Sequence, residues 1–188
     1  MIKKIVLCFM VWFTFTGLLL SNEIDAILDS NYFIKMGINS STVDYDHASS
    51  SLASYLALSG IYEYTSWWHA IGELALTQRK YRVNDDTSIY DVANTYFQVP
   101  FMLRFSKLNK TDQTRFGFLI GSYAEYLLHS TENDVFRGDI GGILGLQYEW
   151  PIYQNQLMSL EFRYSHGLKQ FETIGRHKNV CLSLSYDF

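Results

Sequence analysis

Cysteine, positive charge and long apolar runs are all scarce in this sequence. Of its two cysteines, Cys8 and Cys181, only Cys181 remains if the N-terminus is removed, so no internal disulfide is expected. The 15 basic residues are outnumbered by 19 acidic ones, which argues against nucleic-acid binding because that needs a basic face. The 5 histidines show no metal-ligand spacing, so neither a metal nor another cofactor is expected. Beyond the N-terminus no window approaches about eighteen consecutive apolar residues, which excludes a transmembrane helix there.

The N-terminus holds the one long apolar run and has the pattern of an export signal. Lys3 and Lys4 precede an uncharged apolar run from Ile5 to Leu20. We therefore predict a signal peptide over residues 1–21, with cleavage after Ser21 or after Ala26, and a barrel domain over residues 22–188. Cleavage after Ser21 removes only Lys3 and Lys4, so 15 − 2 = 13 basic residues face 19 acidic ones, a net charge of −6. A retained membrane anchor is the alternative, disfavoured because the run is short and acidic residues follow at once.

Aromatic residues and two-residue alternation are abundant. Aromatics make up 16% of the chain, which suits rings of Tyr and Trp at two membrane interfaces. Apolar and polar residues alternate in eight segments, as they do in half-buried strands. Pro100 lies inside the fourth segment, where we expect a β-bulge because proline removes a donor from the ladder. The predicted strands cover residues 32–39, 51–64, 67–79, 95–107, 115–128, 139–150, 157–166 and 179–188.

The last predicted strand ends on an aromatic residue. Its apolar face carries Leu182, Leu184, Tyr186 and Phe188, while serines and Cys181 lie on the other face. Such a strand resembles the closing strand of bacterial outer-membrane barrels, whose terminal Phe signals to the insertion machinery. The resemblance implies that these four apolar residues form a membrane-insertion signal and that the barrel insertion machinery is a partner.

Small residues on the polar faces of the strands decide between a membrane barrel and a soluble sandwich. Alternation alone does not, because a sandwich with a buried apolar face shows the same pattern. Water would place no size limit on an outward side chain, whereas the interior of an eight-stranded barrel is only just wide enough for side chains. This favours an all-β, eight-stranded antiparallel transmembrane barrel of the outer-membrane type. The small residues are Gly37, Ala57, Ser59, Gly117, Gly121, Gly141 and Gly145.

Charged residues lie on the same faces, which we assign to the lumen. A soluble barrel with an apolar ligand cavity would reverse this pattern. Buried charges persist only when they are paired, so we expect Arg104 and Arg163 to bridge Glu73, Glu125 and Glu161 and to plug the barrel. The predicted lumen charge network is Lys35, Glu63, Glu73, Arg104, Glu125, Glu149, Glu161 and Arg163.

The connections between the predicted strands alternate in length. Short periplasmic turns and longer outer loops are the usual arrangement in outer-membrane barrels. His69, beside Trp67 and Trp68, is expected in the aromatic belt at the periplasmic rim. The short connections are Thr65–Ser66, Asn109–Asp112 and Pro151–Gln156. The longer ones are Ser40–Ser50, Tyr81–Asn94, His129–Gly138 and Gly167–Lys178.

Several of these segments together resemble successive strands of the PorT-like outer-membrane barrel family. Gln98 departs from the family pattern, in which an acid often stands there, and the longer loops hold few glycines. The resemblance implies an outer-membrane barrel that assists secretion or surface functions, and it brings no catalytic residues. The segments are GELALTQRK from Gly72, YFQVPFMLRF from Tyr96, FGFLIGSYAEYLL from Phe116, DIGGILGLQYEW from Asp139, LEFRYSHGL from Leu160 and the terminal YDF.

These features predict a non-enzymatic protein of the cell outer membrane, held in outer-membrane lipids. It would serve as a surface-loop scaffold or as part of an envelope or secretion assembly, with an envelope or extracellular partner left open. The first alternative is a lipid-modifying enzyme using His129–Ser130, or Ser165–His166 with Glu172, but adjacent residues of a strand point apart. The second is a narrow channel, although about eight strands leave no aqueous bore. The third is a soluble periplasmic binding barrel.

Overall fold

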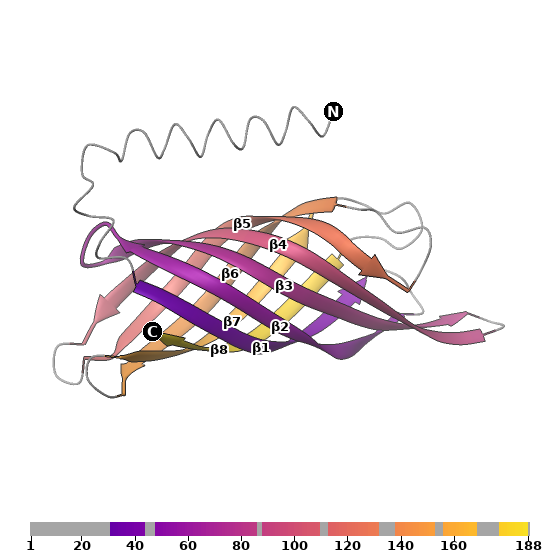
Figure 1. The fold of residues 1–188 in the computed structure, drawn as a ribbon, viewed down its shortest axis with the longest axis horizontal. Helices are drawn as coiled ribbons and strands as arrows, with labels where there is room; N and C mark the ends of the chain where they lie inside the picture. The colour runs from indigo at the N-terminus through magenta and orange to yellow at the C-terminus, as the bar shows by residue number, and fades with distance from the viewer. Residues whose placement is uncertain are drawn as a thin grey trace, which may run out of the picture. The chain divides into compact units, whose positions relative to one another are not determined.

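Eight strands form the protein in its computed structural model, which describes residues 31–43, 48–85, 88–109, 113–131, 138–152, 156–168 and 177–187. The strands are β1 (Asn31–Val43), β2 (Ala48–Glu63), β3 (Trp68–Asp85), β4 (Ser88–Leu108), β5 (Arg115–Ser130), β6 (Gly138–Pro151), β7 (Leu157–Gly167) and β8 (His177–Asp187). Each pairs antiparallel with the next, and β1 pairs with β8 to close the barrel (Figure 1). The predicted eight-stranded antiparallel barrel is confirmed. The predicted signal peptide and its cleavage sites lie outside the described residues.

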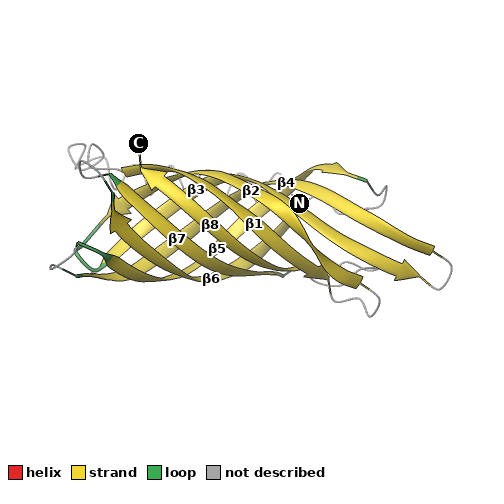
Figure 2. Cartoon of the chain, turned by 90° about the horizontal axis from the view of Figure 1, so that it is seen from below, coloured by secondary structure: helices red, strands yellow, loops and turns green. Residues whose placement is uncertain are grey.

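The strands β3 and β4 are the longest in the described part of the chain, and their neighbours β2 and β5 contain 16 residues each. The two long strands contain 18 and 21 residues, against 11 each in β7 and β8. The stretch Tyr81–Asn94, predicted as a loop, is instead a paired ribbon whose register runs from Arg79 opposite Asn94 to Asp85 opposite Ser88 (Figures 1 and 2). The loop prediction was wrong because it gave weight to the polar run Asn84 to Asp86 and not to Tyr81 and Val92, which pair with each other and are buried on the inner face. We call residues 81–85 and 88–92 the β3–β4 ribbon.

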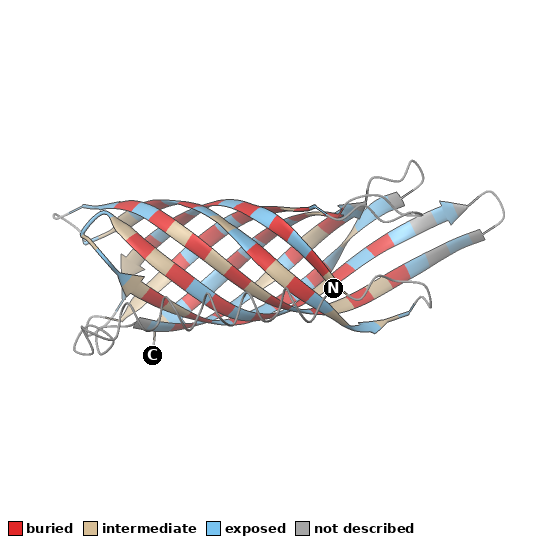
Figure 3. Cartoon of the chain, turned by 90° about the horizontal axis from the view of Figure 1, so that it is seen from above, coloured by how far each residue is buried: buried red, intermediate tan, exposed pale blue. Residues whose placement is uncertain are grey.

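Buried and exposed residues alternate along every strand (Figure 3). The outward positions are apolar and the inward positions carry polar and charged groups, the reverse of a soluble protein. An exposed apolar surface of this extent marks an interaction surface, and around a closed barrel it matches the lipid-facing band of outer-membrane barrels. Among the described residues no helix is long and apolar enough to cross a membrane. Outward apolar residues include Ile34, Leu58, Phe97, Phe118, Leu144, Leu146, Phe162, Leu182 and Leu184.

Pro100 does not cause a bulge. The β4–β5 register stays constant from Tyr96 opposite Leu127 to Leu108 opposite Arg115, and it shifts instead between Thr95 and Tyr96. Pairing with β3 runs to Gly72 opposite Phe101 and resumes at Ala75 opposite Gln98 without a change of register. The missing proline donor therefore interrupts the ladder on the β3 side without displacing the strand. The predicted bulge at Pro100 was wrong.

Inward glycines leave room for large side chains that cross the lumen. A Cβ atom at Gly141 would lie 2.4 Å from Cε1 of Tyr123, and one at Gly121 would lie 2.7 Å from Cα of Met102. Both positions are therefore filled by neighbouring atoms, and the lumen is packed there. This agrees with the size limit that the interior of a narrow barrel imposes.

Candidate functional site

A cluster of five side chains fills the middle of the lumen. We call Lys35, Tyr55, Glu73, Glu161 and Arg163 the central cluster; all five are buried. Nζ of Lys35 donates to Glu73 at 2.5 Å and to Glu161 at 2.8 Å. Arg163 donates twice to Glu73, at 2.9 and 3.0 Å, and also pairs with Glu161. The Tyr55 hydroxyl donates to Glu73 at 2.8 Å. Two cations and two carboxylates thus neutralise each other, as burial requires.

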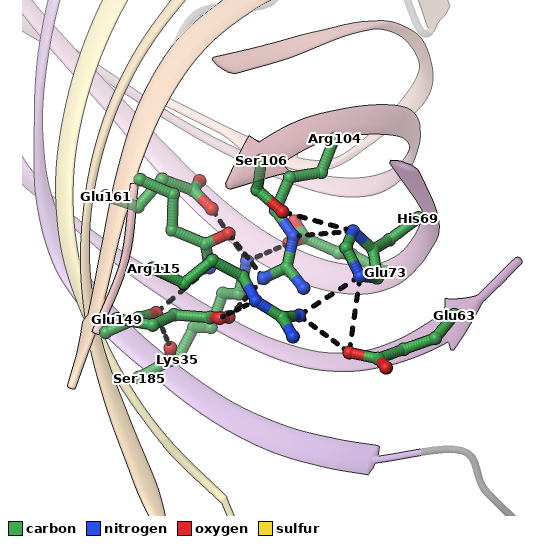
Figure 4. A network of polar contacts seen from close by, with 12 residues as sticks. Lys35, Glu63, His69, Glu73, Arg104, Ser106, Arg115, Glu149, Glu161 and Ser185 are labelled. Atoms are coloured by element: carbon green, nitrogen blue, oxygen red, sulfur yellow. Dashed lines mark hydrogen bonds and ion pairs between the residues drawn. The ribbon is translucent and has the colours of Figure 1, made fainter. Parts of the chain in front are cut away.

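A second cluster lies where the strands meet the short connections, at what we call the turn end. We call Glu63, His69, Arg104, Arg115 and Glu149 the turn-end cluster (Figure 4). Arg104 pairs with Glu149, and Arg115 donates to Glu63 at 2.6 Å. The ring of His69 lies between them, with Nε2 at 3.0 Å from Nη1 of Arg115. This cluster links five strands across one end of the lumen.

A third cluster lies toward the opposite end of the barrel, which we call the loop end. Arg79 donates through both terminal nitrogens to Glu125, at 2.6 and 2.7 Å. Gln98 donates to the same carboxylate at 3.0 Å, and the guanidinium lies 4.8 Å from the ring centroid of Tyr96. The parallel two-bond geometry and the aromatic contact are what a buried arginine needs in place of water.

The expected partners of Arg104 were wrong. It reaches Glu149 and Gln147, whereas Glu125 is held by Arg79, a residue left out of the predicted network. Arg163 does meet two of its expected partners, Glu73 and Glu161. The alternation places side chains on a face, but the tilt of the strands decides which of them share a level of the lumen.

Two residues at the turn end also differ from the expectation. Glu63 was placed in the lumen, yet its side chain is 43% exposed at the rim, because it is the last residue of β2. His69 was expected in the aromatic belt but is fully buried, because it faces inward from the second position of β3. The neighbouring Trp67 is exposed, and its ring is tilted by 32° against that of Phe105, with 6.1 Å between the ring centroids.

Apolar side chains complete the filling of the lumen. They form one buried group with Tyr123. Together with the ionic clusters they fill the lumen with side chains, whereas the lumen of a porin is filled with water. Among the described residues no group of three or more potential metal ligands occurs. The apolar members are Phe33, Ile61, Ile71, Met102, Leu119 and Ile143.

The residues considered for lipid modification are not brought together. Ser165 is buried in the lumen, whereas His166 is on the outer face of the same strand. The hydroxyl of Ser130 donates to Asn94 at 2.7 Å, and His129 is exposed. Glu172 lies outside the described residues. A nucleophile and its base must come within hydrogen-bond reach, and neither pair does so here.

The structure does bring one serine and one histidine together, at a place that the sequence did not indicate. The hydroxyl of Ser106 lies 3.3 Å from Nδ1 of His69, and Nε2 of His69 lies 3.3 Å from Glu63. Ser106 and His69 are buried, however, and the guanidinium of Arg115 takes up the space beside the imidazole. We read this trio as part of the turn-end cluster. The only signal for it in the sequence is that the serine and the histidine both lie on the polar faces of their predicted strands.

The residues of the expected insertion signal lie along β8. Leu182, Leu184 and Tyr186 are exposed on the outer face of the barrel, and Phe188 lies outside the described residues. Their role in insertion stays a prediction.

The closed barrel, apolar outside and charged inside, defines an outer-membrane β-barrel protein. The family model of the outer membrane protein beta-barrel domain matches residues 20–172, and the chain belongs to that family. The predicted location, the cell outer membrane, is thereby confirmed. No curated protein matches the chain significantly.

Solved structures of the same fold come from several bacteria. OprG from Pseudomonas aeruginosa is 11% identical over 85% of this chain and 96% of its own, with a TM-score of 0.57. Ail of Yersinia pestis, solved in complex with the heparin analogue sucrose octasulfate, is 17% identical over 85% of this chain and 99% of its own, with a TM-score of 0.50. Neisserial surface protein A is 12% identical over 84% of this chain and 97% of its own, with a TM-score of 0.50. Likeness at these identities shows the fold alone.

Proposed function

We propose that this outer-membrane barrel is a non-enzymatic surface scaffold that presents the β3–β4 ribbon to a partner outside the cell. The length of β3 and β4, 18 and 21 residues, is the observation that carries this proposal. A transmembrane strand needs about 9–11 residues, so both strands have residues to spare beyond the bilayer. The segments that extend far beyond the membrane face outward in bacterial barrels, and the ribbon is such an extension, so we place the loop end and its ribbon at the exterior.

The surface of the ribbon supports a role in recognition. Arg82 and Asp91 form an exposed cross-strand pair at 2.8 Å, and Asn84 is exposed nearby. Ile89 is 67% exposed, an apolar side chain among polar ones. An ordered backbone with a mixed surface suits contact with an envelope or extracellular macromolecule. A closer relation to the PorT-like barrels, with a role in secretion, stays a prediction.

The packed lumen favours the scaffold over both rival functions. An ion pathway needs a continuous aqueous bore, whereas the central cluster spans the lumen with buried ion pairs. A lipid-modifying enzyme needs a nucleophile that is open to substrate. Planar-bilayer recordings should therefore show no steady conductance, and the covalent structure of lipid A should not depend on His129 or His166. Steady conductance, or a change of lipid A mass in H129A or H166A cells, would overturn the proposal.

Labelling of a cysteine in the ribbon tests its exposure at the surface. In Asn84→Cys cells a membrane-impermeant maleimide should label the protein without permeabilisation. The parent protein is the matched control, because its Cys181 is buried in the lumen. Labelling of N84C only after the outer membrane is opened would place the ribbon in the periplasm and refute the proposal.

A further inference from the structure

The two long edges of the β3–β4 ribbon differ. On one edge β2 follows β3 as far as Ala48 opposite Val83. On the other edge the strand pairing of β4 with β5 ends at Asn94 opposite Ser130. Residues 88–92 of β4 therefore have no strand partner on the side away from β3 within the described part of the chain, and we call them the ribbon edge. Figures 1 and 2 show the ribbon projecting beyond the neighbouring strands.

The hydrogen bonds of Ala93 show which backbone groups face the ribbon edge. Its carbonyl accepts from the amide of Thr131 at 3.2 Å, and its own amide donates to the Thr131 hydroxyl at 3.0 Å. In an antiparallel ladder the N–H and C=O of one residue point to the same side, and those of the next residue point to the other side. Asp91 and Ile89, two and four positions before Ala93, therefore direct their backbone groups to the side that β5 has left. The residues between them bond to β3.

The residues of the ribbon edge suit pairing with a further strand. Their sequence is SIYDV, rich in strand-forming residues and without the lysine or proline that commonly block a sheet edge. Ile89 is 67% exposed. Asp91 is the one charged residue, and Arg82 contacts its carboxylate from the β3 side at 2.8 Å. A carboxylate has about four acceptor sites, so a second cation can approach Asp91 from the side of the edge.

We propose that the ribbon edge binds an extended segment of a partner protein, which joins the sheet as an antiparallel strand beside β4. The backbone groups of Ile89 and Asp91 select a polypeptide, because its own donors and acceptors repeat at the matching spacing. The segment carries a basic residue opposite Asp91 and, two positions later, an apolar residue opposite Ile89. This names the class of partner for the scaffold, and it rests on the proposed function for the side of the membrane from which the partner comes.

A second copy of this chain in the same membrane does not fit the ribbon edge. Antiparallel pairing of two identical edges needs a two-fold axis perpendicular to the strands. Two copies in one membrane are related by an axis along the membrane normal, and the ribbon continues the two tilted strands of the barrel wall (Figure 1). The two edges would therefore cross and not lie antiparallel.

Amide hydrogen exchange, measured by NMR on the full-length protein in detergent micelles, tests the ribbon edge. In the free protein the amides of Ile89 and Asp91 should exchange fast, whereas those of Tyr90 and Val92, bonded to β3, should exchange slowly. The peptide STKTITS can place its lysine opposite Asp91 and its isoleucine opposite Ile89. At saturation it should slow the first two amides roughly tenfold or more and leave the other two unchanged. The same peptide, N-methylated at its lysine and isoleucine, is the matched control and should protect neither.

Two further changes test the backbone and the charge separately. Ile89→Pro removes a donor from the ribbon edge but none from the β3–β4 ladder, because this N–H points away from β3. It should weaken peptide binding, followed at the amide of Asp91, roughly fivefold. The peptide STETITS puts a glutamate opposite Asp91 and should also bind more weakly. Surface labelling of I89P/N84C cells checks that the variant ribbon is intact.

Several results would overturn the proposal. Slow exchange of Ile89 and Asp91 in the free protein would show that the chain itself covers the edge. No protection at millimolar peptide, or equal protection by the N-methylated peptide, would exclude strand addition, and equal binding of STETITS would exclude the basic residue. Protection that rises with protein concentration alone would make a second copy the occupant. Protection by STKTITS, with N84C labelled only after the outer membrane is opened, would uphold the peptide site and refute the surface scaffold.

Discussion

Two arginine–carboxylate pairs begin three residues apart on β3, and in each the arginine donates twice to one carboxylate, at 2.6 and 2.7 Å from Arg79 and at 2.8 and 3.4 Å from Arg82. Arg79 meets Glu125 inside the lumen at 2.6 Å, and both side chains are 0% exposed. Arg82 meets Asp91 on the ribbon at 2.8 Å, with side chains that are 57% and 67% exposed. The buried pair has no water to replace a lost partner, whereas the exposed pair is solvated and screened. Surroundings, rather than geometry, therefore decide what each pair does.

The comparison separates the molecule into two parts with different tasks. In the lumen the carboxylates of Glu73 and Glu125 are each held by several donors, and the loss of one partner would leave a charge in a space that water does not fill. On the ribbon the same residue types keep the strands soluble and leave the surface open to contact. If this contrast is correct, the loss of unfolding free energy caused by a substitution should be largest in the central cluster and smallest on the ribbon.

The largest effect is expected at Glu73. It accepts from Lys35, Arg163 and Tyr55, so Glu73→Gln keeps the shape but leaves two cations with one carboxylate fewer. Breaking a buried ion pair costs roughly 3–5 kcal/mol. Urea unfolding from lipid vesicles, followed by tryptophan fluorescence, should show a loss of unfolding free energy in that range.

Glu63→Gln is the matched control for that experiment. Its side chain is 43% exposed at the rim, so solvent screens its pair with Arg115, and the loss should stay below about 1 kcal/mol. Equal losses in E73Q and E63Q would contradict the contrast between lumen and rim.

The next effect concerns the Arg79–Glu125 pair and separates charge balance from packing. Arg79→Met alone leaves the buried carboxylate of Glu125 with a hydrogen bond from Gln98 but without its cation, and it should cost about 3 kcal/mol. The double variant with Glu125→Met removes both charges and fills the space with apolar atoms, so most of the loss should be regained. The same unfolding measurement provides the double-mutant cycle. Additive losses would mean that the two residues act independently.

The sequence predicted which side of the barrel wall a side chain lies on better than it predicted the height of that side chain along the lumen. Alternation put Phe97, Leu146 and Leu184 on one face and Arg163 on the opposite one, because strand period alone decides which residues share a face. The small residues on the second face then assigned it to the lumen. It did not predict that Arg79 rather than Arg104 holds Glu125, since the level of a side chain depends on strand tilt and register, which involve residues far apart in the chain. The ribbon escaped for another reason: the polar run at its tip, Asn84 to Asp86, has the composition of a loop, although Tyr81 and Val92 are buried on the inner face of its two strands.

The smallest effect is expected on the ribbon itself. Arg82→Ala and Asp91→Ala each remove one partner of a pair that water already solvates, so neither variant should shift the urea midpoint of the barrel. Both should still be surface-labelled through N84C, because the cross-strand backbone ladder from Tyr81 to Asp85 does not depend on this pair. A midpoint shift as large as that of R79M would show that the ribbon is part of the stability of the barrel. Substitutions in the ribbon would then change the stability of the barrel. The contrast between a lumen that stabilises the fold and a ribbon that only presents a surface would be wrong.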